Sequence, residues 1–161
     1  MRIGFGYDVH RLVEGRPLVL GGITVPHHRG LDGHSDADAL LHAITDAILG
    51  AAGLGDIGAH FPDTDAEWEG ADSRVLLRQA MDAVQDVGYD IGNIDATVVI
   101  ERPKLRRHID AMREQIADTV GASPHDISVK ATTSEKMGFV GVEDGAAAYA
   151  VALLVSCETD E

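Results

Sequence analysis

The sequence predicts a layered α/β (α+β) fold, in which a mixed β-sheet has helices packed on one face. Three segments carry apolar residues at helical spacing, and the segments between them are short and rich in β-branched residues, as strands are. Their order, β-β-α-α-β-α-β-β, fits layers of sheet and helix. The chain has 161 residues, so a single domain over residues 1–161 can enclose its own core.

The N-terminal part is expected to form a hairpin, followed by the first helix. The hairpin has strands Arg2 to His10 and Leu18 to Val25, joined through a turn around Glu14-Gly15-Arg16-Pro17. After a polar loop, the helix is expected from Asp36 to Ala52, where apolar side chains recur every three or four residues. The segment Gly53-Leu-Gly55 ends this helix.

The rest of the chain is predicted to alternate helices with strands, after a loop from Asp56 to Ala71 that is rich in Gly, Pro and Asp. In each helix the apolar residues fall on one face, which places that face on the sheet. The predicted elements are helix Asp72–Val87 with Gly88 as its cap, strand Ile94–Ile100, helix Lys104–Val120 ended by Gly121, and strands Ile127–Thr133 and Ala146–Val155.

The composition argues against several classes of protein. Acidic residues outnumber basic ones 27 to 13, and the formal net charge of −14 repels a phosphate backbone, so we expect no nucleic-acid partner. The one cysteine, Cys157, permits neither a disulfide within the chain nor a cysteine-based zinc site. The longest apolar run, Ala146 to Val155, is too short to span a bilayer, and no apolar signal segment begins the sequence. We therefore expect a cytoplasmic protein with no membrane partner.

Asp8, His10 and His42 form the first candidate site. Asp8 and His10 are two apart in a predicted strand, so their side chains point to the same face. His42 lies off the apolar stripe of the first helix, which argues against a buried structural histidine. One carboxylate and two imidazoles with an open fourth position are typical ligands of a catalytic Zn²⁺. The alternative is a hydrogen-bonded surface pair on the strand and an unrelated helix histidine.

Three more polar clusters lie beside the predicted elements. His34-Ser-Asp36 precedes the first helix, where free N–H groups bind phosphate, or where Ser35 or Asp36 is only the N-cap. Asp56-Ile-Gly58 and Phe61-Pro-Asp-Thr-Asp65 lie in the long loop, which either binds hydroxyl groups or is a solvated turn. Lys130-Ala-Thr-Thr-Ser-Glu-Lys136 ends a strand with groups that suit phosphate and a hard cation, or is only a polar exit from that strand.

Together these clusters resemble the 2-C-methyl-D-erythritol 2,4-cyclodiphosphate synthases of the non-mevalonate isoprenoid pathway. The resemblance spans nearly the whole chain, and the combination of motifs is far more specific than any one of them. The matching segments are Gly6-Tyr-Asp-Val-His10, His34-Ser-Asp-Ala-Asp38 with His42, Gly55-Asp-Ile-Gly58, Phe61-Pro-Asp-Thr-Asp65, Gly70-Ala-Asp-Ser73 and Lys130-Ala-Thr-Thr-Ser-Glu-Lys-Met-Gly-Phe139.

The resemblance implies a homotrimer whose active sites lie between neighbouring subunits. It implies Zn²⁺ on Asp8, His10 and His42, and Mg²⁺ or Mn²⁺ on Glu135 with the substrate diphosphate. His34 and Thr133 are the implied catalytic residues, as donors to the transition state. The implied substrate-binding residues are Asp8, Val9, His10, His34, Ser35, Asp56, Ile57, Gly58, Phe61, Pro62, Asp63, Thr64, Asp65, Ile100, Glu101, Arg102, Pro103, Lys104, Leu105, Arg106, Ala131, Thr132, Thr133, Ser134, Glu135, Phe139 and Val142.

The implied activity is the conversion of 4-diphosphocytidyl-2-C-methyl-D-erythritol 2-phosphate to the cyclic diphosphate with release of CMP, a cyclising phosphorus–oxygen lyase reaction. The cytidine diphosphate would lie on the neighbouring subunit, along Ile100 to Arg106 and Ala131 to Glu135. The loop from Asp56 to Asp65 and the pair His34-Ser35 would hold the methylerythritol phosphate end.

Two positions depart from the family pattern. Many members have an arginine in place of Val142, and some have an acidic residue in place of Tyr149; these line an axial cavity that can hold an isoprenoid diphosphate. Since valine cannot pair with a diphosphate, we expect weak or no binding of geranyl or farnesyl diphosphate. Two other functions stay open at this point, namely a zinc-dependent phosphohydrolase and a non-catalytic trimer that binds an isoprenoid diphosphate.

Overall fold

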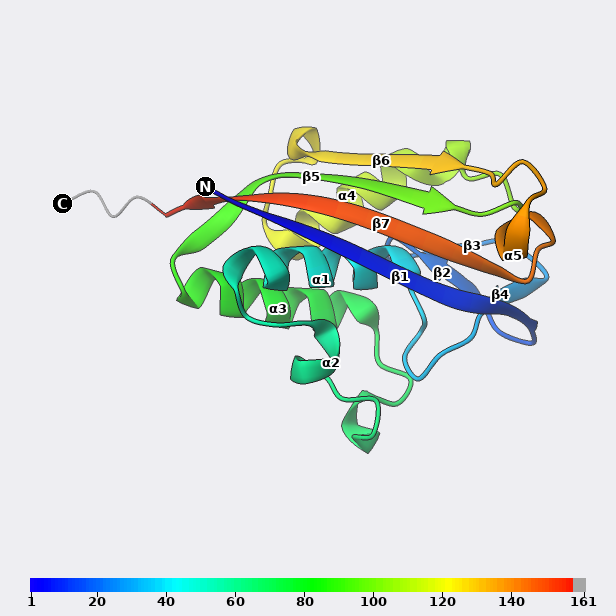
Figure 1. Ribbon diagram of the computed structural model, residues 1–161, viewed down its shortest axis with the longest axis horizontal. Coiled ribbons are helices and arrows are strands. Elements are labelled where there is room, and N and C mark those ends of the chain that lie inside the picture. Colours follow the sequence, from blue (N-terminus) through cyan, green and yellow to red (C-terminus); the bar gives the residue numbers. More distant parts are fainter. Residues whose placement is uncertain (158–161) are drawn as a thin grey trace.

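The computed structural model describes residues 1–157, which form a five-stranded sheet with helices against it (Figure 1). The strand order is β4-β1-β7-β5-β6. Strands β5 and β6 run parallel and the other neighbours run antiparallel, so the sheet is mixed, as predicted. The strands of this sheet are β1 (Arg2–Glu14), β4 (Arg29–Leu31), β5 (Tyr89–Val99), β6 (Ile127–Thr132) and β7 (Gly145–Ser156).

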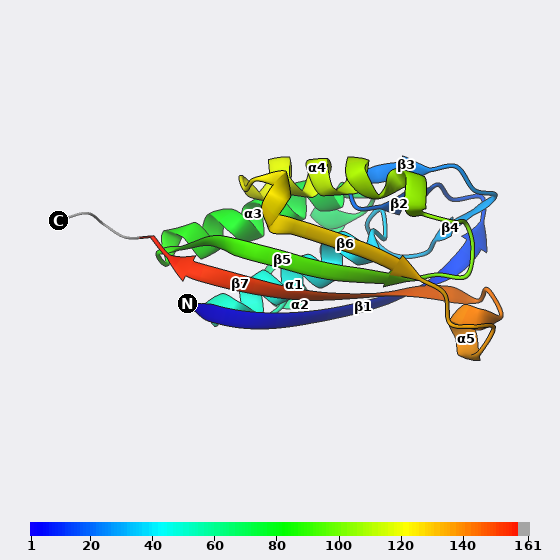
Figure 2. The ribbon, with the colours of Figure 1, turned by 90° about the horizontal axis from the view of Figure 1, so that it is seen from above.

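The main helices cover only one face of the sheet, which confirms the predicted layers. Helices α1 (Ala39–Ala52), α3 (Ser73–Asp86) and α4 (Ile109–Val120) lie together on one side, as Figure 2 shows. Their buried side chains form one core with the inward side chains of the strands. Short helical segments lie in the connections: α2 (Ile57–His60), α5 (Gly138–Gly141) and 3-10 turns at Ala66–Trp68, Arg106–His108 and Pro124–Asp126.

The other face of the sheet is exposed, and along β1 and β7 it is apolar. Along β1 every second side chain from Ile3 to Val9 is exposed, while Gly4 and Gly6 between them are buried. On β7, Tyr149 and Val151 are exposed on the same face, and the rings of Tyr7 and Tyr149 lie 5.2 Å apart. A contiguous exposed apolar patch of this kind usually marks an interaction surface.

Two glycines on β1 let α1 lie very close to the sheet. A Cβ atom added at Gly4 or Gly6 would lie 1.9 or 1.8 Å from the backbone oxygen of Ala47 or Ala43 in α1. Asp8 and His10 are the next two residues on that face of the strand. The close approach of strand and helix therefore brings their side chains to the first turns of α1, where His42 lies.

We expect Gly6→Ala to lower the free energy of unfolding by about 3 kcal/mol or more, because the added methyl group collides with backbone and not with a flexible side chain. Gly50→Ala is the matched control. It adds the same group on α1 where nothing lies within 4 Å, so the better helix propensity of alanine should raise stability by up to about 1 kcal/mol. Urea unfolding of both variants measures the difference. Equal stabilities would contradict the close packing of α1 on β1.

The predicted N-terminal hairpin is wrong. β1 runs on to Glu14 and pairs with β7 and β4, while β2 (Leu18–Leu20) pairs with β3 (Ile23–Val25) in a separate two-stranded sheet. The turn between β2 and β3 is Gly21-Gly22, both with positive φ, and such a pair favours a tight two-residue hairpin. The segment predicted as one strand is therefore a small hairpin in itself.

Two predicted helix starts are also wrong. The first helix begins at Ala39 with Asp38 as its N-cap, because Ala37 has a φ of +57°, which a right-handed helix cannot contain. The third long helix begins at Ile109 after the 3-10 turn Arg106–His108. Lys104 therefore lies in a loop and not at the N-terminus of that helix.

Candidate functional site

The cluster predicted from Asp8, His10 and His42 is formed in the structure. Asp8 Oδ2 lies 2.8 Å from His10 Nε2 and 3.1 Å from His42 Nδ1, and the two nitrogens are 3.4 Å apart. Each residue offers one ligand atom, and these atoms lie within 4.8 Å of one another. A carboxylate oxygen and two imidazole nitrogens that converge in this way can hold a metal ion. The alternative, in which His42 is unrelated to the strand pair, is wrong.

The charges in the cluster suit a cation. Burial of Asp8 opposes ionisation, but hydrogen bonds from His10 and His42 outweigh it and hold the pKa of Asp8 at about 2. Burial likewise opposes protonation of His10, yet the ion pair with Asp8 raises the pKa of His10 above its ordinary value. Asp8 is therefore a carboxylate over the whole physiological pH range, ready to bind a positive charge.

Asp38 anchors the start of α1, a role that the sequence pattern did not predict. Its fully buried carboxylate accepts hydrogen bonds from the N–H groups of Leu41 (3.0 Å), Gly21 (3.0 Å) and Gly22 (2.7 Å). The first bond caps the helix, and the other two tie it to the β2–β3 turn. Asp38 thereby fixes the helical turn that carries His42.

We expect Asp38→Ala to lower the free energy of unfolding by about 3 kcal/mol, since it removes a helix cap and leaves two buried N–H groups and one partly buried N–H group without this acceptor. The loss should depend on pH. Burial outweighs the three hydrogen bonds and raises the pKa of Asp38 from 3.8 to about 6. A carboxyl with a raised folded pKa favours folding while it is protonated, and that contribution is lost as pH rises through this window.

The stability difference between wild type and Asp38→Ala should therefore be larger near pH 4 than near pH 7. Urea unfolding of both proteins at the two pH values measures it, and titrating groups that do not interact with Asp38 cancel in the difference. A difference that grows with pH would contradict the direction of the Asp38 shift.

A pocket of about 440 Å³ opens beside the metal cluster. It joins His10 and His42 with residues predicted to hold the methylerythritol phosphate end. Its lining residues are His10, Gly33, His34, Ser35, His42, Ile57, Gly58, Phe61, Pro62, Asp63, Trp68 and Leu76. The sequence reasoning missed Trp68, whose ring stacks edge-on against Phe61 at 5.1 Å; a signal was available, because it is the one tryptophan of the chain and lies in the predicted functional loop.

Three residues predicted for this end do not line the pocket. Asp56 caps α2 by accepting from the N–H of Ala59, and Asp65 caps the following 3-10 turn by accepting from the N–H of Glu67. Thr64 is exposed between them. Asp65 still borders the site through its backbone, since its carbonyl lies 3.2 Å from His34 Nε2.

A second pocket, of about 470 Å³, lies where the parallel strands β5 and β6 end. Such strand ends are common ligand sites. Its lining includes most of the residues predicted for cytidine diphosphate: Ile100, Glu101, Pro103, Lys104, Leu105, Arg106, Ile109, Val129, Lys130, Ala131, Thr132 and Thr133. Glu101 accepts hydrogen bonds from the N–H groups of Ser134 and Lys136, each 3.1 Å, and so joins the two loops that border the pocket.

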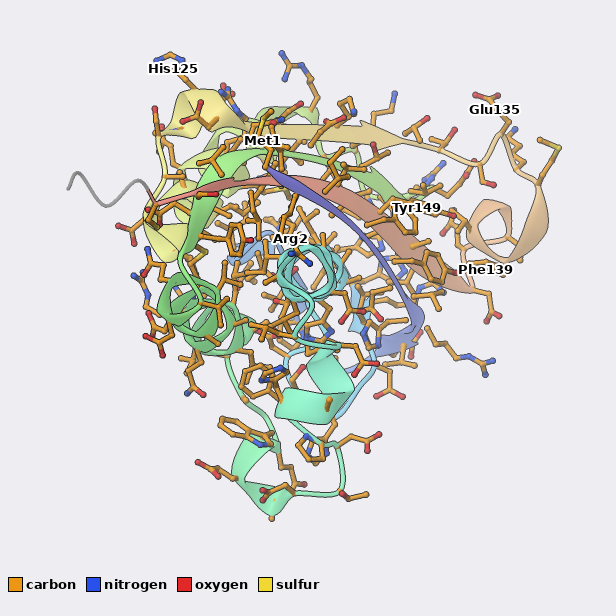
Figure 3. All side chains as sticks on the ribbon, turned by 60° about the vertical axis from the view of Figure 1, so that its left-hand side comes forward. Met1, Arg2, His125, Glu135, Phe139 and Tyr149 are labelled. Atoms are coloured by element: carbon orange, nitrogen blue, oxygen red, sulfur yellow. The ribbon has the colours of Figure 1, made fainter. Side chains whose placement is uncertain are left out.

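The two pockets share no lining residue among residues 1–157. His34 lies in one and Thr133 in the other, so a single chain does not bring the two predicted catalytic residues together. Figure 3 shows Glu135 on the loop beyond β6, with its side chain directed away from the rest of the molecule. Arg102 lines neither pocket; its Nε lies 3.6 Å from Glu143 Oε1.

Val9, Phe139 and Val142 also lie apart from the two pockets. Val9 and Phe139 border a third hollow at the exposed face of the sheet, together with His10. Val142 follows α5 and is 71% exposed. In the described part of the chain, no helix is both long enough and apolar enough to cross a membrane.

Comparisons with known proteins agree with this geometry. The family model of the YgbB family matches residues 1–155. The 2-C-methyl-D-erythritol 2,4-cyclodiphosphate synthase of Salinibacter ruber is 64% identical over 156 residues, which cover 97% of this chain and 99% of the relative.

Two solved structures extend the likeness to the fold. The bifunctional IspDF of Campylobacter jejuni is 46% identical with a TM-score of 0.93, over 96% of this chain and 42% of that one. A 2C-methyl-D-erythritol-2,4-cyclodiphosphate synthase bound to CDP is 42% identical with a TM-score of 0.88, over 96% of this chain and 100% of that one. By sequence match along nearly its whole length, the chain belongs to the YgbB family.

Proposed function

We infer that this chain is an enzyme of isoprenoid precursor biosynthesis. It converts 4-diphosphocytidyl-2-C-methyl-D-erythritol 2-phosphate to 2-C-methyl-D-erythritol 2,4-cyclodiphosphate and releases CMP. The observation that carries this inference is the 64% sequence identity with a synthase of that name over 97% of this chain, together with the converging side chains of Asp8, His10 and His42. The compartment that we propose is the cytoplasm, in keeping with a single cysteine in the sequence.

The donor set supports Zn²⁺ at the cluster. Two imidazole nitrogens and one carboxylate oxygen are zinc ligands, and the adjoining pocket leaves an open side for a substrate oxygen. Zinc bound there would act as a Lewis acid on a phosphoryl oxygen. Glu135 offers one exposed carboxylate, so we propose that it holds Mg²⁺ or Mn²⁺ only together with the oxygens of a bound diphosphate.

The residues of the chain serve the reaction by position and charge. In the proposed reaction the 2-phosphate attacks the β-phosphorus of the same molecule and CMP leaves. Because the attacking oxygen is tethered in the substrate, no protein nucleophile is needed, and holding both ends in place is the main task. Lys104 and Arg106 give the second pocket positive charge in a chain of net charge −14. His34 and Thr133, one from the lining of each pocket, are the residues that we propose as hydrogen-bond donors to the transition state.

A homotrimer with shared sites would join the two halves. The metal pocket and the second pocket have no lining residue in common in the described chain, and in such a trimer each would be completed by a neighbouring subunit. The exposed apolar face between Ile3 and Val9 on β1 and around Tyr149 on β7 provides a surface for self-association. We therefore propose that the metal half of one subunit and the Thr133 half of its neighbour form one active site.

One incubation tests the function. The purified protein with Zn²⁺ and Mg²⁺ is given the cytidyl substrate, and ³¹P NMR follows the products. We expect the cyclic diphosphate and CMP to form together in equal amounts. Release of inorganic phosphate would instead favour the zinc-dependent phosphohydrolase. No turnover, combined with tight binding of farnesyl diphosphate, would favour the non-catalytic isoprenoid-binding trimer, against which Val142 argues because valine offers no charge.

A further inference from the structure

Ser73 and Asp36 lie behind His42 and have no part in the proposed reaction. We propose that they are positioning residues: the Asp36 carboxylate orients the Ser73 hydroxyl, which accepts a hydrogen bond from Nε2–H of His42 and so holds the ring with Nδ1 toward the metal. This inference rests on the proposed metal site, but not on the identity of the substrate.

The three side chains form a continuous chain of hydrogen bonds. Ser73 Oγ lies 2.8 Å from His42 Nε2, the ring nitrogen that faces away from Asp8. The Ser73 hydroxyl is bonded to Asp36 Oδ1, and the Ser73 N–H donates to Asp36 Oδ2 at 3.0 Å. Ser73 is only 1% exposed, so water does not replace these partners. These hydrogen bonds link the N-terminus of α3 to the helix that carries His42.

The direction of these bonds follows from counting protons. A carboxylate only accepts, and the hydroxyl of Ser73 has one proton, so that proton is donated to Asp36. Ser73 Oγ can then only accept a hydrogen bond from His42 Nε2, so Nε2 must carry a proton. Nδ1, on the other side of the ring, faces Asp8 and His10. A metal ion held there would take the place of the proton on Nδ1, while Nε2 keeps its own.

The hydroxyl of Ser35 is the competing partner, 3.2 Å from the same nitrogen. If Ser35 donated to an unprotonated Nε2, that lone pair would face the lone pairs of Ser73 Oγ at 2.8 Å, which is unfavourable. Ser35 Oγ already accepts from the N–H of Ala37. The opposite tautomer of His10 is set in the same manner, because its Nδ1–H donates to the carbonyl of Asp32 at 2.7 Å and leaves Nε2 for the metal.

Two substitutions test the roles separately. Ser73→Ala removes the acceptor, and we expect apparent zinc affinity to fall about 10- to 100-fold. Asp36→Ala removes the acceptor of the Ser73 hydroxyl, whose proton can then turn toward His42 Nε2 and displace the ring proton from that nitrogen. We expect it to weaken zinc binding at least as much as Ser73→Ala does, although serine is still present.

Asp72→Asn is the matched control. It removes the same charge one residue from Ser73, but its carboxylate bonds Arg74 and not His42. We expect its zinc affinity to stay within about twofold of wild type, since a surface charge acts weakly. Zinc affinity is measured on the full chain by competition with a chelating dye, and thermal unfolding of each variant shows whether it is folded.

The proton on Nε2 is read from long-range ¹H–¹⁵N spectra of the full chain without metal. We expect Nε2 of His42 to carry a proton in wild type and in Asp72→Asn, and to have lost it in Asp36→Ala. An Nε2 without a proton in the wild type would overturn the inference even if both variants failed to fold. Unchanged zinc affinity in folded Ser73→Ala would overturn it too. Neither readout requires turnover, so a failed activity assay with these results would refute the proposed reaction alone.

Discussion

His42→Ala is expected to abolish stoichiometric zinc binding and to lower turnover of the cytidyl substrate by about 1,000-fold or more. His42 supplies one of the three ligand atoms, and its side chain is only 12% exposed between Asp8 and His10. Removal leaves a carboxylate and one imidazole, too few for a tightly held zinc ion. We expect turnover to fall further than it would on substitution of a residue that only supports a ligand, because the charge that would polarise the phosphoryl group is lost with the metal.

Zinc content by mass spectrometry of the purified protein and the initial rate of CMP release measure the two effects. His125→Ala is the control, since this exposed histidine lies in the 3-10 turn before β6 (Figure 3) and belongs neither to the cluster nor to the lining of either pocket. We expect it to keep one zinc per chain and full activity. A His42→Ala protein that still binds one zinc per chain would remove His42 from the site.

The metal cluster could be predicted because both of its parts are local patterns. The period of two along a strand places Asp8 and His10 on one face, and the helical period places His42 outside the apolar stripe. Their meeting depends on Gly4 and Gly6, which let α1 lie against β1. The sequence shows these glycines, but only the structure shows that they face a helix.

The partner of β1 could not be predicted in the same way. β1 pairs with β7 at the other end of the chain, and pairing of that kind depends on packing across the whole sheet and not on a turn signal. The role of Asp38 is similar. Its spacing from His42 was visible, but two of its three donors come from the Gly21-Gly22 turn, which only the tertiary fold places beside it. Long-range contacts therefore account for the main errors.

Mixing two inactive variants is expected to restore activity to about a quarter of the wild-type level. His42→Ala damages the metal half of a site, and Glu135→Gln damages the other half while keeping the shape of the side chain at its φ of +52°. In a trimer with shared sites, an interface is active when a Glu135→Gln subunit supplies the metal half and a His42→Ala subunit supplies Glu135. Random assembly from equal amounts gives this arrangement at about one interface in four.

The double variant mixed with wild type distinguishes shared sites from other causes of recovery. In equal amounts, shared sites leave about a quarter of all sites active, whereas sites within one chain leave about half. Co-refolding two differently tagged chains, with native mass spectrometry to verify mixed trimers, gives both values from CMP release. The physical reason to expect the lower value is that the pocket of His34 and the pocket of Thr133 share no residue in one chain. Verified mixed trimers of the two single variants without activity would show that the halves do not meet across an interface.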